Sequence, residues 1–543
     1  MRRLPLLLVL ALVSVLCAVP VAVGAVGGVT EFSTGMPAGG APQAITAGPD
    51  GGLWFTLPGV NAIGRITPTG QVSTFTAGIQ AGAQPWGIVA GPDGNLWFTE
   101  KGGNAIGRIT PTGQVTEFRI PTDGSQPWGI TVGSDGNLWF TESQSSANNI
   151  GRITPQGQVT EFTSGPGATV QALGITASPD GNLWFVEAGT NSIVQMSTQG
   201  AVVNAFSAGI TAGAGLYAIV SGPDGNLWFT EQAGNRVGRI TPAGVVTEFP
   251  IAAAGMAPSG IVAGADGALW VTENGASNTG NNVLRITTAG AMTQYQNGIS
   301  ANAGLLGIAA GPDGNLWFTE SAGNRIGRLL SGVEPVVTAA PQLSGSPVIG
   351  TALSVTTGTW KYLPTSYRYR WLRCTTAAAT KCSTVPSQTK ATYTITNADQ
   401  GQFLRASVVA VNLNGTSAGA PTEVSAQVPT SAFTVTKPTI EYRQRDVLLR
   451  STVTTSWAGR ITQVGTTTQG GRTVHRCGVE QRVGGGGAVQ IVCRLPYASR
   501  RTLRYTSLWM TITTTFQATD GPVATKQQAL RVPVRLFPWR TAG

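Results

Sequence analysis

An internal repeat limits what this chain can fold into more than any other feature of its sequence. A ten-residue segment, GPDGNLWFTE in its most regular copies, occurs seven times within the first 333 residues, each time with an Asp-Gly pair before the tryptophan and an asparagine after it. The tryptophan recurs every 42–47 residues, at Trp54, Trp97, Trp139, Trp184, Trp228, Trp270 and Trp317. A repeat of this length indicates an array of similar structural units, stacked or arranged in a ring.

Each repeat is expected to form four short strands, as the copy at residues 85–118 illustrates. Residues 85–90 and 96–100 are apolar and β-branched runs separated by the turn Pro-Asp-Gly-Asn. An Asp-Gly pair supplies the positive φ that a tight hairpin needs. Two further runs, 106–110 and 114–118, flank a Pro-Thr-Gly turn. A four-stranded unit with this period is typical of a propeller blade, so the repeats predict a seven-bladed β-propeller.

The two ends of the repeat region complement each other. The seventh repeat stops after residues 327–330 without a fourth strand, whereas residues 29–32 read Val-Thr-Glu-Phe, the same sequence as residues 115–118. We therefore expect residues 28–33 to complete the last blade and close the ring, because a closed ring leaves no free sheet edge. The alternative is an open solenoid of the same units.

The composition agrees with an all-β protein. Val, Ile, Thr, Trp and Phe are common, 73 of the 543 residues are Gly, and 11% are charged. β-branched and aromatic residues favour strands, and this balance of apolar and charged residues excludes a disordered polymer. The recurring tryptophans are expected to pack between blades. A recurring arginine is expected to pair with acidic neighbours, at Arg65, Arg108, Arg152, Arg239, Arg285 and Arg328.

The N-terminal segment has the pattern of an export signal. Met1, Arg2 and Arg3 precede an apolar run from Leu4 to Val23, and small residues follow. This pattern predicts a signal peptide at residues 1–25. The run is nearly long enough to span a bilayer, so an uncleaved anchor is the alternative. We expect the mature protein to be secreted or associated with the cell envelope.

Cysteine usage agrees with export. Beyond the predicted signal, four cysteines form two local pairs, Cys374 with Cys382 and Cys477 with Cys493. Three pairings are formally possible, of which pairing between nearest neighbours is the simplest. Disulfides persist outside the cytosol, where small β domains gain most from them.

Charge divides the chain near residue 333. Residues 1–333 have 12 Lys and Arg against 18 Asp and Glu, whereas residues 334–543 have 23 against 7. A Pro- and Ala-containing stretch at 333–341 is a natural boundary. We expect a propeller at 26–333, a second domain at 334–430 and a basic β-rich domain at 431–543. The last would suit an anionic cell-envelope polymer, and no nucleic-acid partner is expected because no nucleic-acid motif is present.

The repeat resembles that of the virginiamycin B lyase (streptogramin lyase) family. The run GPDGNLWFTE followed by GNAIGRITPTGQVTEF carries the resemblance over residues 28–332. It implies a seven-bladed propeller that opens cyclic streptogramin B antibiotics by elimination at an ester, with a catalytic histidine and a Mg²⁺ ion held by carboxylates. Residues 341–428 resemble bacterial Ig-like modules through Trp-Leu-Arg-Cys at 371–374 and Ala-Asp-Gln-Gly at 398–401, which implies an Ig-like β-sandwich. Residues 431–543 carry no such resemblance, and their stretches rich in Thr, Val, Ile and Arg predict a second small β domain.

The chain departs from the lyases at the histidines, which in that family lie in a Pro-His-Gly-Ile-like segment near the central channel. The matching positions here are Gln43, Trp86, Trp128, Leu173, Tyr217, Ser259 and Leu306. The single histidine, His475, lies far outside the propeller. No catalytic residue is therefore predicted, and whether the chain is an enzyme stays open at this stage.

The metal site that the resemblance implies is only partly matched. One metal-binding carboxylate of the lyases matches a glutamate that ends the second strand of six repeats, at Glu100, Glu142, Glu187, Glu231, Glu273 and Glu320. Another lies two residues before a catalytic histidine, where this chain has no acidic residue in any repeat. Because Mg²⁺ needs several oxygen ligands, no metal or other cofactor is predicted; the alternative is a Mg²⁺ ion held by the glutamates.

Aromatic residues in place of the histidines favour ligand binding. Trp86, Trp128 and Tyr217 near the channel, with Glu100, Glu142 and Glu231, would suit a small molecule, a peptide or a glycan. The alternative is that the rings fill the channel as core. We predict a monomeric, secreted, non-catalytic binding protein. The other hypotheses are a streptogramin B lyase that uses Glu and Mg²⁺, and a glycan-cleaving enzyme with two carboxylates.

Overall fold

The computed structural model describes most of the chain after the predicted signal peptide, of which only residue 25 lies inside the described ranges. These ranges are 25–144, 149–164, 171–275, 281–429, 433–443, 446–455, 457–469, 472–485, 487–496, 507–519 and 523–534. The chain divides into two compact units. The first contains the residues up to Val336 together with two short segments, Trp360–Ser366 and Ala410–Ser417, and the second contains the rest.

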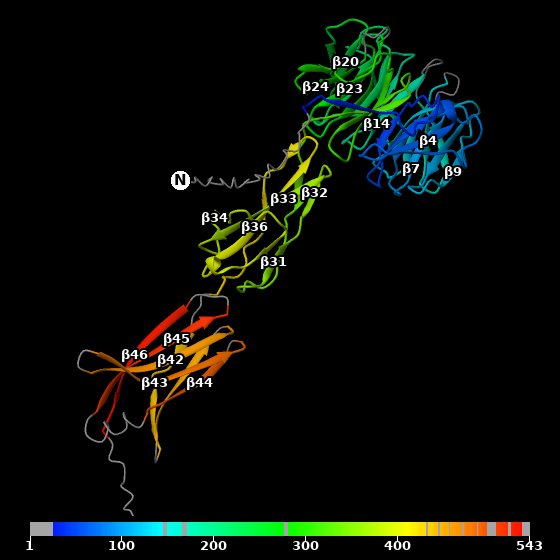
Figure 1. Ribbon diagram of the computed structural model, residues 1–543. Helices are drawn as coiled ribbons and strands as arrows, with labels where there is room; N and C mark the ends of the chain where they lie inside the picture. Colours follow the sequence, from blue (N-terminus) through cyan, green and yellow to red (C-terminus); the bar gives the residue numbers. More distant parts are fainter. Residues whose placement is uncertain are drawn as a thin grey trace, which may run out of the picture. The chain divides into compact units, whose positions relative to one another are not determined.

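Seven four-stranded antiparallel sheets, the blades, make up most of the first unit (Figure 1). We number them by the order of their tryptophans. Blade 1 consists of β2 (Ile45–Ala47), β3 (Leu53–Leu57), β4 (Ala62–Ile66) and β5 (Val72–Phe75), and blade 2 of β6 (Pro85–Ala90), β7 (Leu96–Glu100), β8 (Ala105–Ile109) and β9 (Val115–Arg119). Blade 3 consists of β10 (Pro127–Val132), β11 (Leu138–Glu142), β12 (Asn149–Ile153) and β13 (Val159–Thr163), and blade 4 of β14 (Ala172–Ala177), β15 (Leu183–Glu187), β16 (Ser192–Met196) and β17 (Val202–Phe206). Blade 5 consists of β18 (Leu216–Ser221), β19 (Leu227–Glu231), β20 (Arg236–Ile240) and β21 (Val246–Pro250), and blade 6 of β22 (Pro258–Ala263), β23 (Leu269–Glu273), β24 (Asn282–Ile286) and β25 (Met292–Tyr295).

The seventh blade closes the ring with a strand from the other end of the repeat region. It contains β26 (Leu305–Ala310), β27 (Leu316–Glu320), β28 (Arg325–Leu329) and β1 (Val29–Phe32). β1 pairs antiparallel with β28, with Val29 opposite Leu329 and Phe32 opposite Ile326. The predicted closure by residues 28–33 is therefore confirmed, and the open solenoid is excluded.

The recurring tryptophans form the core of the blades, as predicted. Each has an exposed fraction of 0% and stacks on an aromatic ring of the fourth strand, with ring centroids 5.3–5.5 Å apart. In six blades the indole N–H donates to the aspartate of the Asp-Gly turn, as from Trp97 to Asp93 at 3.1 Å. One motif thus supplies both the hairpin turn and the partner of the buried indole.

The prediction that the recurring arginines pair with acids is correct in only two blades. Arg65 pairs with Asp50 at 2.5 Å, and Arg285 pairs with Asp266 at 2.6 Å. Blades 2, 3, 5 and 7 have an asparagine two residues after the aspartate, and its amide occupies the second carboxylate oxygen, as Asn95 does on Asp93 at 2.8 Å. In these blades the guanidinium instead lies over the stacked rings, 5.3–5.7 Å from their centroids.

The recurring asparagines join each blade to the loop before the next one. Asn104 has a positive φ of 51°, donates to the carbonyls of Ile120 and Thr122, and accepts from the Ser125 N–H at 2.7 Å. Asn61, Asn191, Asn235 and Asn324 make equivalent contacts. Their recurrence is explained by this structural role.

The described chain after the propeller also consists mainly of β-strands. A two-stranded sheet contains β29 (Val336–Ala339) and β32 (Thr359–Lys361), and a three-stranded sheet contains β30 (Leu343–Ser344), β31 (Ala352–Val355) and β35 (Thr392–Thr394). A five-stranded sheet contains β33 (Ser366–Cys374), β34 (Cys382–Thr384), β36 (Phe403–Asn412), β37 (Gly415–Thr416) and β38 (Ala420–Pro421). Two four-stranded sheets follow, of β39 (Phe433–Val435), β40 (Thr439–Tyr442), β41 (Val447–Thr455) and β44 (Gly487–Arg494), and of β42 (Gly459–Gln469), β43 (Arg472–Val483), β45 (Leu508–Ala518) and β46 (Val523–Val532). The domain boundaries and the Ig-like assignment stay predictions.

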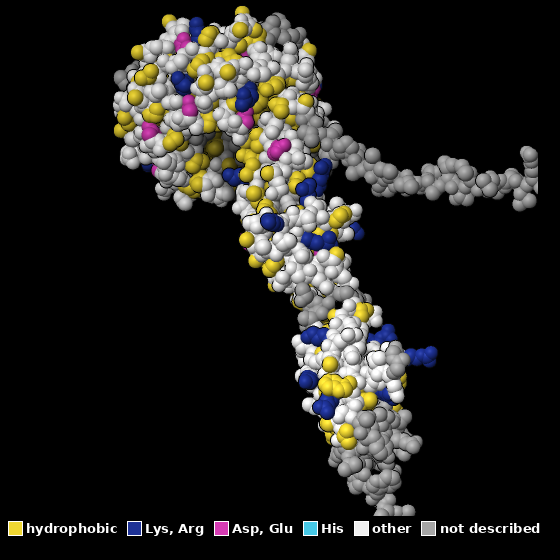
Figure 2. Space-filling model, turned by 90° about the vertical axis from the view of Figure 1, so that its left-hand side faces the viewer, with side chains coloured by type: hydrophobic (Ala, Val, Ile, Leu, Met, Phe, Trp, Pro, Cys, Tyr) yellow, Lys and Arg dark blue, Asp and Glu magenta, His cyan; other side chains and the backbone are white. Residues whose placement is uncertain are grey.

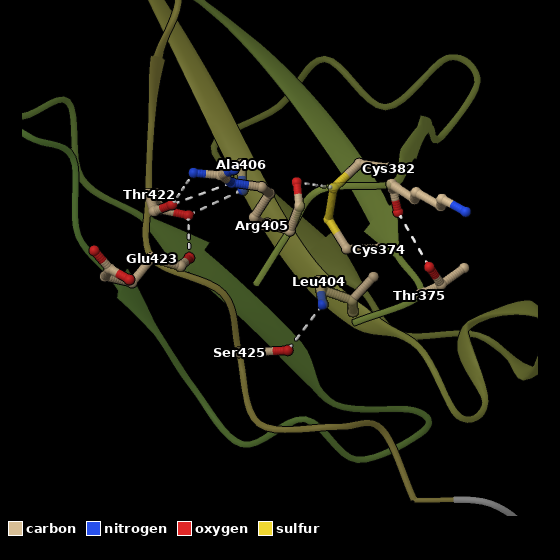
Figure 3. The surroundings of a disulfide bond; sticks show 11 residues. Cys374, Thr375, Cys382, Leu404, Arg405, Ala406, Thr422, Glu423 and Ser425 are labelled. Atoms are coloured by element: carbon tan, nitrogen blue, oxygen red, sulfur yellow. Dashed lines mark hydrogen bonds between the residues drawn. A yellow bond between two sulfur atoms is a disulfide. The ribbon is translucent and has the colours of Figure 1, made fainter. Parts of the chain in front are cut away.

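Both predicted disulfides are present. Cys374 lies opposite Cys382 where β33 pairs with β34, beside a network in which Thr422 bonds to Arg405 and Ala406 (Figure 3). Cys477 of β43 is bonded to Cys493 of β44. Since such bonds persist outside the cytosol, they indicate an extracytoplasmic protein.

The last two sheets carry basic side chains. Arg472, Arg482 and Arg531 are exposed, and on the face drawn in Figure 2 the charged side chains visible on these sheets are Lys and Arg. Arg500, Arg501 and Arg504, which lie close together in the sequence, are outside the described residues. Within the described part of the chain, no helix has the length and apolar character needed to cross a membrane.

Candidate functional site

The first strands of the seven blades surround a central channel with a cavity of about 250 Å³. Each blade contributes one isoleucine to its wall: Ile45, Ile88, Ile130, Ile175, Ile219, Ile261 and Ile308. A glycine or alanine precedes each isoleucine and also lines the cavity. Of the seven positions that match the lyase histidines, five line it as well: Gln43, Trp86, Trp128, Tyr217 and Leu306. Tyr217 is the only titratable side chain in this lining.

An irregularity in the first strands places these residues. In blade 2 the pairing of β6 with β7 shifts between Pro85 and Ile88, which leaves the Trp-Gly pair outside the regular ladder. The hydroxyl of Thr99 accepts from the Gly87 N–H at 2.8 Å and donates to the Trp128 carbonyl of blade 3 at 2.9 Å. A threonine makes the same link to the next blade in six blades, at Thr56, Thr99, Thr141, Thr230, Thr272 and Thr319. Blade 4 has Val186 there.

The three predicted aromatic residues lie together in the channel. The ring centroids of Trp86 and Trp128 are 4.6 Å apart with the planes tilted by 50°, and Tyr217 meets Trp128 edge-on at 6.0 Å. Burial raises the pKa of Tyr217 to about 12, so its hydroxyl remains a neutral donor. Among the described residues, none hydrogen-bonds to the two indole N–H groups or to this hydroxyl. The cluster thus presents aromatic surface and three available donors.

Lys101 completes the site and was not predicted. It directly follows the last residue of β7, and its ammonium lies 4.5 Å from the ring centroid of Trp86 and 4.4 Å from that of Trp128. Burial lowers its pKa. Its position in the repeat, directly after the strand-ending glutamate, could have revealed it. In two other blades the residue at this position contacts a histidine-equivalent residue: Gln232 donates to the Ser259 hydroxyl, and the Ser321 hydroxyl accepts from Gln43.

The structure does not place the predicted glutamates in the channel wall. Glu100, Glu142 and Glu231 are 0–1% exposed and do not belong to the cavity lining. Burial, and then a glutamate of the fourth strand, raises the pKa of each to about 8. The fourth-strand partners are Glu117, Glu161 and Glu248. Glu100, Glu142 and Glu231 are therefore mostly protonated at neutral pH, and the Oε1 of each has no hydrogen-bond partner among the described residues.

The fourth-strand glutamates have a structural role. Glu117 accepts from the Gln80 N–H at 2.6 Å, and Glu248 accepts from the Thr211 N–H at 2.6 Å. They hold the loops between blades. In blade 6 the fourth strand has Gln294 instead, and its amide donates to Glu273 at 2.9 Å.

These donor sets do not fit the Mg²⁺ ion of the lyases. In the described residues no three His, Cys, Asp or Glu side chains are grouped so as to hold a metal. Of the six glutamates that match the lyase ligand, four face one other carboxyl group, whereas Glu187 faces hydroxyls and Glu273 faces amides. The positions two residues before the histidine-equivalent ones are Ala, Gln or Gly. No chemical step through a metal is derived for this chain.

The closed ring and its aromatic channel define a seven-bladed β-propeller with an internal ligand-sized cavity. The model of the virginiamycin B lyase family matches residues 21–208 and 166–336. Together these segments cover more than half of the chain, which therefore belongs to the virginiamycin B lyase family. A comparison with curated proteins found no match.

Solved structures of lyases are similar to the propeller. A streptogramin B lyase is 34% identical, with a TM-score of 0.51, over 56% of this chain and 97% of its own. Virginiamycin B lyase from Staphylococcus aureus is 34% identical, with a TM-score of 0.51, over 56% of this chain and 98% of its own. A catalytically inactive histidine-to-alanine variant of the S. aureus enzyme, with quinupristin, has the same identity and coverage and a TM-score of 0.50.

Proposed function

We propose that this protein is a non-catalytic, extracytoplasmic binding protein that holds a small ligand in the propeller channel, against Trp86, Trp128 and Tyr217. The observation that carries the proposal is the exchange at the seven histidine-equivalent positions. All seven lack a general acid or base of the lyase kind, and five of them line the cavity.

The chemistry of the cavity supports binding rather than turnover. Elimination at an ester needs a group that abstracts a proton within hydrogen-bond reach of the ligand. The described lining of the cavity contains no carboxylate or imidazole, and the pKa of Tyr217 at about 12 makes it a poor base at neutral pH. The same lining gives no support to a glycan-cleaving enzyme, which needs two carboxylates across one cleft.

A relative shows that binding and catalysis are separable in this family. The S. aureus structure with quinupristin is of a variant that lost one histidine and is catalytically inactive. A propeller of this fold thus keeps a ligand without its full catalytic set. In our proposal the present chain has taken this separation further, with tryptophan and tyrosine in place of histidine.

The remaining parts of the proposal concern where the protein acts. The two disulfides support an extracytoplasmic location, and the basic C-terminal sheets suit an anionic cell-envelope polymer. We propose a monomer, because closure of the ring removes the sheet edge that would otherwise pair with a second copy.

Benzamide, a neutral single-ring compound of suitable size, tests the proposal. Saturation-transfer NMR with the full chain should show saturable binding, and Trp86→Ala and Trp128→Ala should each weaken it. Trp509→Ala is the matched control, because Trp509 is 65% exposed on β45, outside the propeller. Equal loss of binding in the control, or absence of saturable binding for benzamide, benzoate, glucose and glucuronate alike, would refute the channel as a ligand site.

A further inference from the structure

Lys101 is a charged group without a counter-ion at the mouth of the candidate site. Its ammonium lies over the faces of Trp86 and Trp128, 4.5 and 4.4 Å from their centroids. No carboxylate among the described residues pairs with it, and burial alone accounts for its lowered pKa. Its neighbour Glu100 is turned to the other face of the strand, where Gln80 donates to it at 3.2 Å. The contact with two rings therefore leaves a positive charge unneutralised.

Lys101 has no charged equivalent in the other blades, and no charged side chain lies in the described lining of the cavity. The residues that directly follow the second strands of the seven blades are Pro58, Lys101, Ser143, Ala188, Gln232, Asn274 and Ser321. Lys101 is the only charged member of this set, and the cavity lining contains no charged side chain. Six blades thus keep a neutral residue where blade 2 has a lysine beside the only pair of adjacent indoles in the lining.

A partly desolvated cation next to aromatic faces selects among ligands. An anion would neutralise the ammonium at short range, in surroundings where charge interactions are stronger than in water. A cationic ligand would have to displace Lys101 from the ring faces and remain near its charge. A flat ring would find the part of the two half-buried indoles that stays exposed and three free donors, and a cavity of about 250 Å³ suits one ring rather than a large molecule.

We infer that the channel site takes a small carboxylate with a single ring, whose ring packs on Trp86 and Trp128 while its carboxylate pairs with Lys101. The inference rests on the proposed function, because it names the ligand class of the same site. Two sources share this chemistry, aromatic acids and uronic acids.

A comparison of benzoate with benzamide isolates the charge, since the two compounds have the same ring and nearly the same shape. With the full-length protein, benzoate should bind about fivefold more tightly than benzamide in titrations followed by saturation-transfer NMR, the effect of one partly exposed charge pair. Lys101→Gln should remove this difference, and Lys101→Arg should keep it. Arg119→Gln, which removes an exposed cation of the same blade paired to Asp123, should leave it unchanged.

The outcomes are distinct. Equal binding within both pairs, benzoate with benzamide and glucuronate with glucose, or a preference for the carboxylate that survives Lys101→Gln, would overturn the carboxylate inference and leave the proposed function standing. If none of the four compounds binds (benzoate, benzamide, glucuronate and glucose), both the carboxylate inference and the proposed function are overturned. Glucuronate binding more tightly than glucose, in place of benzoate over benzamide, would identify the ring as a sugar, and the reverse as an arene. Tighter binding of benzylamine than of benzoate would refute the role of Lys101.

Discussion

The threonine bridges around the channel lead to a quantitative prediction for Thr99→Val. Valine has nearly the shape of threonine, so the substitution removes the hydroxyl without opening a cavity. Two hydrogen bonds are lost, from the Gly87 N–H at 2.8 Å and to the Trp128 carbonyl at 2.9 Å. At a net value of about 1 kcal/mol each, the variant should lose about 2 kcal/mol of unfolding free energy.

Blade 4 offers the reverse experiment in the same protein. Val186 occupies the position of Thr99 and belongs to the same apolar cluster as Tyr217 of blade 5, and the main chain of Tyr217 lies close to Gly174 of blade 4. Val186→Thr should add a hydroxyl that links the two blades and raise the unfolding free energy by about 1 kcal/mol.

Scanning calorimetry of the full chain measures both changes on the propeller transition. For a domain of this size, about 2 kcal/mol corresponds to a fall in Tm of roughly 5 °C. Because the hydroxyl of Thr99 also fixes the main chain beside Trp86, Thr99→Val should weaken benzamide binding, whereas Val186→Thr should not. An unchanged Tm for Thr99→Val, together with a lower Tm for Val186→Thr, would refute the view that these hydroxyls join the blades.

Three further substitutions test the buried acids and the close packing of the blades. The pKa of Glu100 is raised from 4.5 to about 8 in the folded state, so the native protein holds an extra proton, and the stability from this group is lost as pH rises between these two values. Urea unfolding at several pH values should show that Glu100→Gln flattens this decline by about 1 kcal/mol per pH unit. Gln294→Glu, which builds the acid pair of blade 2 into blade 6, should make the decline steeper. A slope that neither variant changes would contradict the assignment. Gly107→Ala would place a Cβ 2.1 Å from the ring of Phe98 and should destabilise the propeller by about 1–3 kcal/mol in the same unfolding assay, and a wild-type midpoint would contradict the packing described.

Much of the fold could be predicted because the repeat carries its own local rules. Each Asp-Gly pair specifies a turn, and the spacing specifies four strands per unit. The match between residues 29–32 and 115–118 was sufficient to predict that β1 closes blade 7. The arginines were mispredicted where the Asp-Gly turn ends in asparagine, because two side chains compete for one carboxylate and the nearer amide takes it.

The candidate site was less predictable, because it depends on which blades become neighbours and how side chains turn. Trp86, Trp128 and Tyr217 were found because they match the positions of the lyase histidines, which the resemblance places near the channel. Lys101 was missed because its contact with Trp128 crosses from one blade to the next. The glutamates were expected to face the ligand, but strand alternation turns them into the blade, and no pattern in the sequence distinguishes the two directions.

The most direct test of the account is incubation of the full-length protein with a streptogramin B antibiotic and Mg²⁺, beside an active virginiamycin B lyase as a positive control. Elimination leaves the mass unchanged, so chromatography with fragment-ion mass spectrometry must separate the linear product from the ring. The account predicts that the ring stays intact under conditions in which the control opens it completely. Accumulation of linear product, in an amount that grows with the concentration of this protein, would contradict it.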